Sequence, residues 1–213
     1  MKQIKSLVAV VTVVVLSSFT IVHELVPPAV KLPAKMSVKA DAYKVDAEHS
    51  KLTWLAKKVT GQHSGTIDVS AGTLNVEKNV LKGGNFDLDT KSIKVTDITD
   101  QETNAKLLGH LKSEDFFAVD QFDKAKFVIT SAVTRGAGLY TIKGNLTIKG
   151  ITNEVVFPAT VKIDNSKLVA NAKITVDRTK YGIKFRSKNF FENLGDKTIY
   201  DDFELNIQLA ANR

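Results

Sequence analysis

Hydrophobic and polar residues alternate along most of the chain from Tyr43 onward. β-Branched and aromatic residues fill the apolar positions, and Gly, Asn and Asp interrupt the pattern about every ten residues. A period of two predicts strands, because successive strand residues point to opposite faces. The predicted strands are 52–57, 64–69, 72–77, 81–89, 126–133, 139–149, 151–163, 168–176 and 200–209.

Short turn sequences separate these strands and predict that consecutive strands are neighbours in space. The turns are expected at 77–79, 136–138, 149–150 and 165–167, where Gly and Asn tolerate a positive φ. About eight strands with few interruptions can close on themselves and remove the sheet edges. The sequence therefore predicts an all-β fold, an eight-stranded antiparallel lipocalin-like barrel with one or two short helices. A two-sheet sandwich is the alternative, since periodicity does not show closure.

One segment between the strands has a helical pattern. Thr99-Asp100-Gln101-Glu102 resembles a capping box, and a helical apolar stripe follows it and ends at Gly109. Phe116 and Phe117 come shortly afterwards, behind a polar turn. Two adjacent phenylalanines cannot both face one side of a strand, so we expect a helical turn that caps an apolar interior.

A second irregular stretch, 178–197, holds four aromatic residues but shows no strand period. We expect a long loop or partial helix near a barrel rim. The chain has eleven Phe, ten of them after residue 40. Phenylalanine has no polar group, so those inside a barrel must pack on each other or on an apolar guest. Ordinary core and pocket lining are equally compatible with this count.

The N-terminus resembles an export signal. Lys2 and Lys5 precede an apolar run, 7–22, that is short for a membrane span and stops at His23 and Glu24. A Val-x-Ala cleavage motif ends at Ala40, well beyond the run. We expect residues 1–40 to be a signal peptide or an N-terminal membrane tether with its linker, and 41–213 to be one domain, periplasmic or secreted.

The charge distribution argues against nucleic-acid binding. Of the net charge of +7, residues 1–40 supply +4, from five lysines and one glutamate, which leaves +3 for the remainder. Lysines in the domain are mostly interleaved with acids, as on an ordinary solvated surface. The absence of cysteine excludes disulfides, thiolate chemistry and cysteine-linked lipid.

Few residues suggest catalysis. Three histidines of the domain, His49, His63 and His110, could bind a metal if the fold brought them together, but their spacing is not that of a ligand set. Ser50 adjoins His49 and therefore faces the other side of a strand, and no Gly-x-Ser-x-Gly elbow is present. We expect a protein that is not an enzyme and uses no cofactor.

Four motifs in order resemble the YceI-like family. They are Tyr43-Lys44-Val45-Asp46-Ala47-Glu48-His49-Ser50, His110-Leu111-Lys112-Ser113-Glu114-Asp115-Phe116-Phe117, Gly144-Asn145-Leu146-Thr147-Ile148-Lys149-Gly150 and Arg178-Thr179-Lys180-Tyr181-Gly182. The resemblance covers residues 43–211. It departs at Leu107-Leu108-Gly109, where many family members carry a charged residue, and at 182–197, a longer tract that would be a lid or a surface loop.

The resemblance implies an exported barrel that encloses a long apolar molecule such as a polyisoprenoid, quinone or fatty-acid derivative, without catalysis. We expect the ligand to be lined by Trp54, Phe86, Phe116, Phe117, Phe127, Ile148, Phe157 and Phe185. Its polar end is assigned to His49, His110 and Arg178. For His110, a hydrogen bond to loop backbone is a stronger alternative than a ligand contact. For Arg178, a structural salt bridge is the stronger alternative.

Two other functions stay open. A structural or interaction protein would fill its barrel with its own side chains, and a metal protein would use the three histidines. Cavity volume separates the first from a lipid binder. The sequence is compatible with a monomer or a homodimer.

Overall fold

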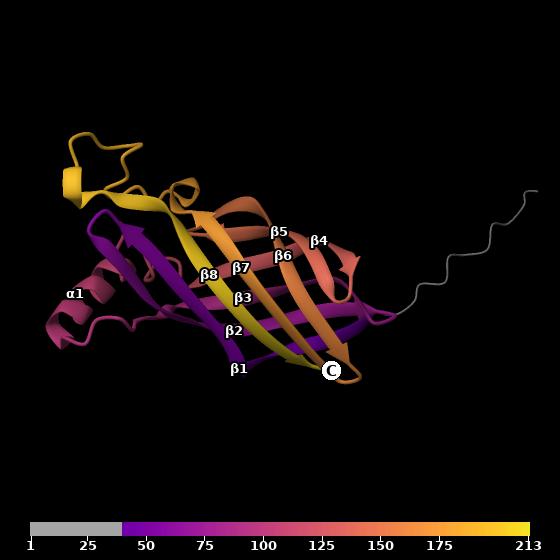
Figure 1. Ribbon diagram of the computed structural model, residues 1–213. Coiled ribbons are helices and arrows are strands. Elements are labelled where there is room, and N and C mark those ends of the chain that lie inside the picture. The colour runs from indigo at the N-terminus through magenta and orange to yellow at the C-terminus, as the bar shows by residue number, and fades with distance from the viewer. Residues whose placement is uncertain (1–39) are drawn as a thin grey trace, which may run out of the picture. The chain divides into compact units, whose positions relative to one another are not determined.

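Eight strands follow one another both in sequence and in space. The computed structural model describes residues 40–213. The strands are β1 (Asp41–Lys58), β2 (Gly61–Glu77), β3 (Val80–Val95), β4 (Lys124–Gly136), β5 (Leu139–Ile148), β6 (Ile151–Asp164), β7 (Lys167–Asp177) and β8 (Ile199–Asn212). Each pairs antiparallel with the next, and β8 pairs with β1, so the sheet closes (Figure 1). The predicted closed barrel is confirmed, and the sandwich is wrong.

The hairpin turns use left-handed backbone conformations, which Gly and Asn adopt readily and Lys adopts less readily. Lys78 and Asn79 have φ of 49° and 62°, and Lys149 and Gly150 have φ of 50° and 73°. Two consecutive positive φ values give a turn whose twist matches that of the flanking strands. Asn165 likewise has φ of 43°. The turns predicted at 77–79, 149–150 and 165–167 are therefore confirmed.

Most strands are longer than predicted. The two predicted strands 64–69 and 72–77 form one strand, β2, with a register shift against β3 between Val69 and Ala71. A bulge of this kind bends and twists a strand without ending it, which suits the curvature of a barrel. β3 also continues beyond the predicted residue 89 to Val95.

The helix α1 (Gln101–Lys112) joins β3 to β4. Asp100 is its N-cap, with the carboxylate accepting from Thr103 N–H at 2.8 Å. The predicted end at Gly109 is wrong, because the helix continues to Lys112, where Ser113 N–H caps the carbonyls of Gly109 and His110. Gly109 is exposed, and Leu111 beyond it packs against the barrel core, which favours one more turn.

The two ends of the barrel differ. α1 and the loop between β7 and β8 lie at the same end, which we call the mouth, and the C-terminus lies at the other (Figure 1). The β7–β8 loop holds two short 3₁₀ helices, η1 (Arg178–Tyr181) and η2 (Gly195–Lys197), in agreement with the irregular segment predicted at 178–197. The β1–β2 and β5–β6 turns also belong to the mouth, because consecutive strands run in opposite directions.

The predicted export signal or tether in residues 1–40 lies outside the described residues, apart from Ala40, and stays a prediction. Within 40–213, no helix combines the length and the apolar character that crossing a bilayer requires.

Candidate functional site

A cavity of about 100 Å³ lies in the mouth half of the barrel. The lining residues come from β1, β2, β3, β4, β5 and β8, from α1 and from the segments after α1 and β7. They are almost all apolar: Trp54, Ala56, Ile67, Leu88, Thr90, Ile93, Leu111, Phe116, Phe117, Ala125, Leu146, Ile148, Arg178, Ile183, Ile199, Tyr200, Phe203 and Leu205. Such a lining favours an apolar guest over water, which needs several polar partners.

Strand alternation directs Trp54 and Ile148 toward this cavity, and their predicted contact with a ligand stays a prediction. Trp54 lies opposite Gly65 on β2, and a Cβ at Gly65 would come within 2.7 Å of the indole ring. The glycine thus leaves the space that the ring occupies. The indole N–H is buried and has no hydrogen-bond partner within residues 40–213. Because Trp54 is the only tryptophan of the chain, its fluorescence can report on the cavity.

Phe116 and Phe117 both line the cavity from a turn that follows α1. Phe116 N–H donates to Ser113 O at 3.1 Å, and Phe117 N–H donates to Leu111 O at 3.1 Å. This turn releases the two side chains from the alternation of a strand, so both reach the interior. The prediction of an apolar cap after the helix is confirmed.

His110 and Phe185 pack beside Phe116. The His110 ring meets the rings of Phe116 and Phe185 edge-on, with centroids 4.9 and 4.6 Å apart. His110 Nε2 lies 3.0 Å from Asp115 Oδ2, so the imidazole pairs with a loop carboxylate. Neither residue is among those that line the cavity, and both support its wall. Their predicted ligand contacts stay predictions.

The other three predicted lining residues fill the opposite half of the barrel. Phe127 packs between Phe86 and Phe157, with ring centroids 5.4 and 5.6 Å away. All three are buried and border a second apolar cavity of only about 40 Å³. The barrel interior is therefore divided into a larger cavity at the mouth and a half that is largely filled by apolar side chains, the three phenylalanines among them.

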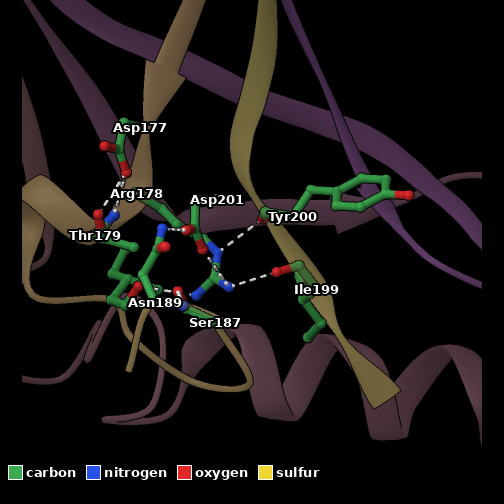
Figure 2. Close-up of polar contacts among 9 residues, drawn as sticks. Asp177, Arg178, Thr179, Ser187, Asn189, Ile199, Tyr200 and Asp201 are labelled. Carbon is green, nitrogen blue, oxygen red and sulfur yellow. Dashed lines mark hydrogen bonds and ion pairs between the residues drawn. The ribbon is translucent and has the colours of Figure 1, made fainter. Parts of the chain in front are cut away.

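Arg178 holds the β7–β8 loop to the start of β8 (Figure 2). Its Nε donates to Tyr200 O at 3.0 Å, Nη1 to Ile183 O at 2.8 Å, and Nη2 to Ile199 O at 3.0 Å and Asp201 Oδ1 at 3.2 Å. Four of the five guanidinium donors are thus used. This arrangement supports the structural alternative and leaves at most one N–H for a ligand head group.

Burial perturbs two ionisable side chains in the same loop. It lowers the pKa of Arg178 from its usual value, an effect that Asp201 and Asp177 partly offset. Burial, and then the negative charge of Asp177, raises the pKa of Tyr181 to about 12. The Tyr181 hydroxyl is buried and has no partner within residues 40–213. Tyr181 is therefore neutral at physiological pH and Arg178 remains charged.

His49 lies on the outside of the barrel. Its side chain is 74% exposed, and Nδ1 lies 2.9 Å from Asp46 Oδ2 in a region where β1 changes register. This position gives no support to the head-group contact predicted for His49. His63 pairs separately with Asp97 at 2.9 Å. In the described part of the chain, no three His, Asp or Glu side chains gather to hold a metal ion, so the structure does not join the three histidines.

Sequence reasoning missed more than half of the lining residues. Phe203 and Leu205 on β8 alternate inward, and Leu88 on β3 shares the inward parity of Phe86, so these three could have been found from parity. Thr90 has this same parity, whereas Ile93 has the opposite parity and is also buried, so placing Ile93 required the register, which the sequence did not supply. The Thr90 hydroxyl is itself occupied, since it donates to Phe122 O at 2.6 Å.

Comparison with known proteins identifies the family. A family model described as "YceI-like domain" matches residues 43–211. A UPF0312 protein of Pseudomonas fluorescens is 28% identical over 156 residues, 69% of this chain and 79% of the relative. A UPF0312 protein of Staphylococcus aureus is 39% identical over 83 residues, 36% of this chain and 46% of the relative. The chain thus aligns with about half the length of the staphylococcal relative.

Two solved structures share the fold. BcnA of Burkholderia cenocepacia superposes with a TM-score of 0.63 at 19% identity, over 79% of this chain and 99% of that one. A polyisoprenoid binding domain from Saccharophagus degradans, implicated in plant cell wall breakdown, gives 0.59 at 12% identity, over 80% and 97%. At these identities the likeness concerns the barrel. The family match over residues 43–211 shows that the chain belongs to the YceI-like domain family.

Proposed function

We propose that the chain is an exported binding protein that carries or sequesters a long apolar molecule, a polyisoprenoid, quinone or fatty-acid derivative. The observation that carries this proposal is the apolar cavity at the barrel mouth, bordered by Phe116, Phe117 and Trp54. The structural neighbour described as a polyisoprenoid binding domain supports the ligand class. No catalytic step forms part of the proposal.

The cavity dimensions define how such a ligand would sit. About 100 Å³ exceeds a single water site but falls below the roughly 300–1,000 Å³ of pockets that enclose drug-sized molecules. The end of an apolar chain would enter the cavity, and the rest would leave through the mouth. At about 25 cal/mol per Å², an end segment that buries about 200 Å² gains roughly 5 kcal/mol before ordering costs.

The experiment titrates the full chain with a ubiquinone analogue that bears a short isoprenoid tail. Quinones quench tryptophan emission, so we expect saturable quenching of Trp54, reversed by a competing polyprenol. Ala56→Phe places a ring in the larger cavity and should abolish saturation, whereas Ala170→Leu, beside the second cavity, should leave it unchanged. Absence of saturable quenching, or equal quenching in Ala56→Phe, would contradict the proposal.

The filled half of the barrel favours a second candidate, an interaction protein that acts through its surface. Phe86, Phe127 and Phe157 border a cavity of only about 40 Å³ in the half of the barrel away from the mouth. This candidate predicts that Ala56→Phe stabilises the protein and that no apolar ligand quenches Trp54 in any variant. The same titration therefore separates the two functions.

A further inference from the structure

Exposed apolar side chains gather around the mouth of the barrel. Five of the exposed large hydrophobic residues belong to the β1–β2 turn, the start of β6, the β7–β8 loop and the start of β8, and we call them the mouth rim: Val59, Ile151, Phe190, Phe191 and Tyr200. Phe190 and Phe191 are 47% and 49% exposed. Adjacent half-exposed phenylalanines are an unfavourable use of a surface loop unless an apolar partner covers them.

The same loop carries the positive charge of the domain. Between residues 180 and 197 there are five basic residues and two acidic ones, a net charge of +3. Residues 41–213 also sum to +3, so the remainder of the domain is neutral. The five basic residues are Lys180, Lys184, Arg186, Lys188 and Lys197, and all are exposed. Within the described residues, none of them forms an ion pair with an acid.

Basic and aromatic residues interleave within this segment. Lys184 Nζ lies 4.6 Å from the centre of the Phe190 ring, and the Arg186 guanidinium lies 5.0 Å from that of Phe185. Aromatic rings flanked by cationic side chains match a lipid interface, where rings enter the acyl boundary and Lys and Arg reach the phosphates.

Hydrogen bonds hold the β7–β8 loop in the conformation that exposes Phe190 and Phe191. Asn189 Nδ2 donates to Asp201 Oδ2 at 2.6 Å, next to the Arg178 contacts (Figure 2). The amides of Phe190 and Phe191 donate to Ser187 O at 3.0 and 2.9 Å, and Ser187 is completely buried. These hydrogen bonds therefore hold the two rings in an exposed position, and the loop needs no rearrangement to meet a flat surface.

We infer that the mouth rim docks on an anionic lipid bilayer, so that the cavity opens toward the membrane from which its ligand is taken. The uptake of a ligand from the membrane rests on the proposed function, whereas the docking of the mouth rim does not. Phe190 and Phe191 enter the acyl boundary, and Lys184 and Lys188 contact lipid phosphates. Neutral lipid alone attracts the rim less, because the cations then gain no anionic partner.

The test places a fluorescent probe on the rim of the full chain. Trp54→Phe removes the native tryptophan, and Phe190→Trp adds an indole to the rim; Leu139→Trp, in the same background, is the matched control at the opposite end, where Leu139 is 51% exposed. Each variant is mixed with vesicles of phosphatidylglycerol and phosphatidylcholine that carry brominated acyl chains. We expect strong quenching at position 190 and little at position 139.

Charge provides the second arm. Lys184→Gln and Lys188→Gln, added to the probe variant, should each raise the anionic lipid needed for half-maximal quenching about fivefold. The inference would be overturned if quenching were absent at position 190 or equal at both positions. The second outcome includes the case in which the N-terminal segment alone holds the chain on vesicles. Quinone uptake from solution by the unmodified chain is scored separately, so docking and ligand binding can fail independently.

Discussion

Replacing Arg178 with methionine should destabilise the barrel without acting through the ligand. Arg178 is 5% exposed, and its guanidinium supplies four hydrogen bonds, three to backbone carbonyls and one to Asp201. Methionine keeps a flexible, largely unbranched side chain but has no N–H donor, so it leaves these acceptors unpaired. Breaking a buried pair of this kind costs about 3–5 kcal/mol. For a domain of this size, that corresponds to a fall in melting temperature of roughly 6–20 °C.

Urea unfolding followed by circular dichroism measures this loss. Arg135→Met is the matched control, because Arg135 is exposed and makes a single side-chain bond, to Thr141 Oγ1 at 3.1 Å. We expect the control to change the free energy of unfolding by less than about 0.5 kcal/mol. A loss below about 1 kcal/mol in Arg178→Met, together with loss of quinone binding, would refute the reasoning and assign Arg178 to the ligand.

Three further changes test the packing and the helix cap. Gly144→Ala should cost about 1–3 kcal/mol in urea unfolding, because its Cβ would overlap the Phe127 ring; an unchanged midpoint would argue against this close approach. Phe157→Ala should cost about 3–5 kcal/mol and admit longer isoprenoid tails in the quenching titration; an unchanged preference for length would show that the cavities stay separate. Hydrogen bonds from Thr103 lower the pKa of Asp100, so its cap stabilises the fold above the unfolded pKa of about 3.9 and is lost as the pH falls through the lower folded value. Asp100→Asn should remove this part of the acid dependence of the urea midpoint.

The barrel could be predicted from the sequence because the signals for strands and turns are local. Alternation and turn chemistry act over a few residues, and the parity of Phe116 and Phe117 already placed both at a cap. The division of the interior was not predictable, because Phe86 and Phe127 meet only through the register of β3 against β4. A register shift of one residue between these two strands would have turned one of the two rings to the outer face.

The bonds of Arg178 were also beyond the sequence. Two of its acceptors, Ile199 O and Tyr200 O, lie 21 and 22 residues away along the chain, across the β7–β8 loop. Only the path of that loop brings them together, and a long loop has no repeating pattern from which its path can be derived. The resemblance to the family singled out Arg178 but did not indicate its hydrogen-bond partners.

The most direct test of the central claim is to purify the full chain natively, extract it with organic solvent and identify the lipids by mass spectrometry, in parallel with Ala56→Phe. We predict an isoprenoid-type or other long apolar molecule in near-stoichiometric amount with the unmodified chain and its loss from the variant, whose larger cavity is filled. Equal lipid content in both proteins, or no lipid in either together with no uptake of added polyprenol, would contradict a binding function for this barrel.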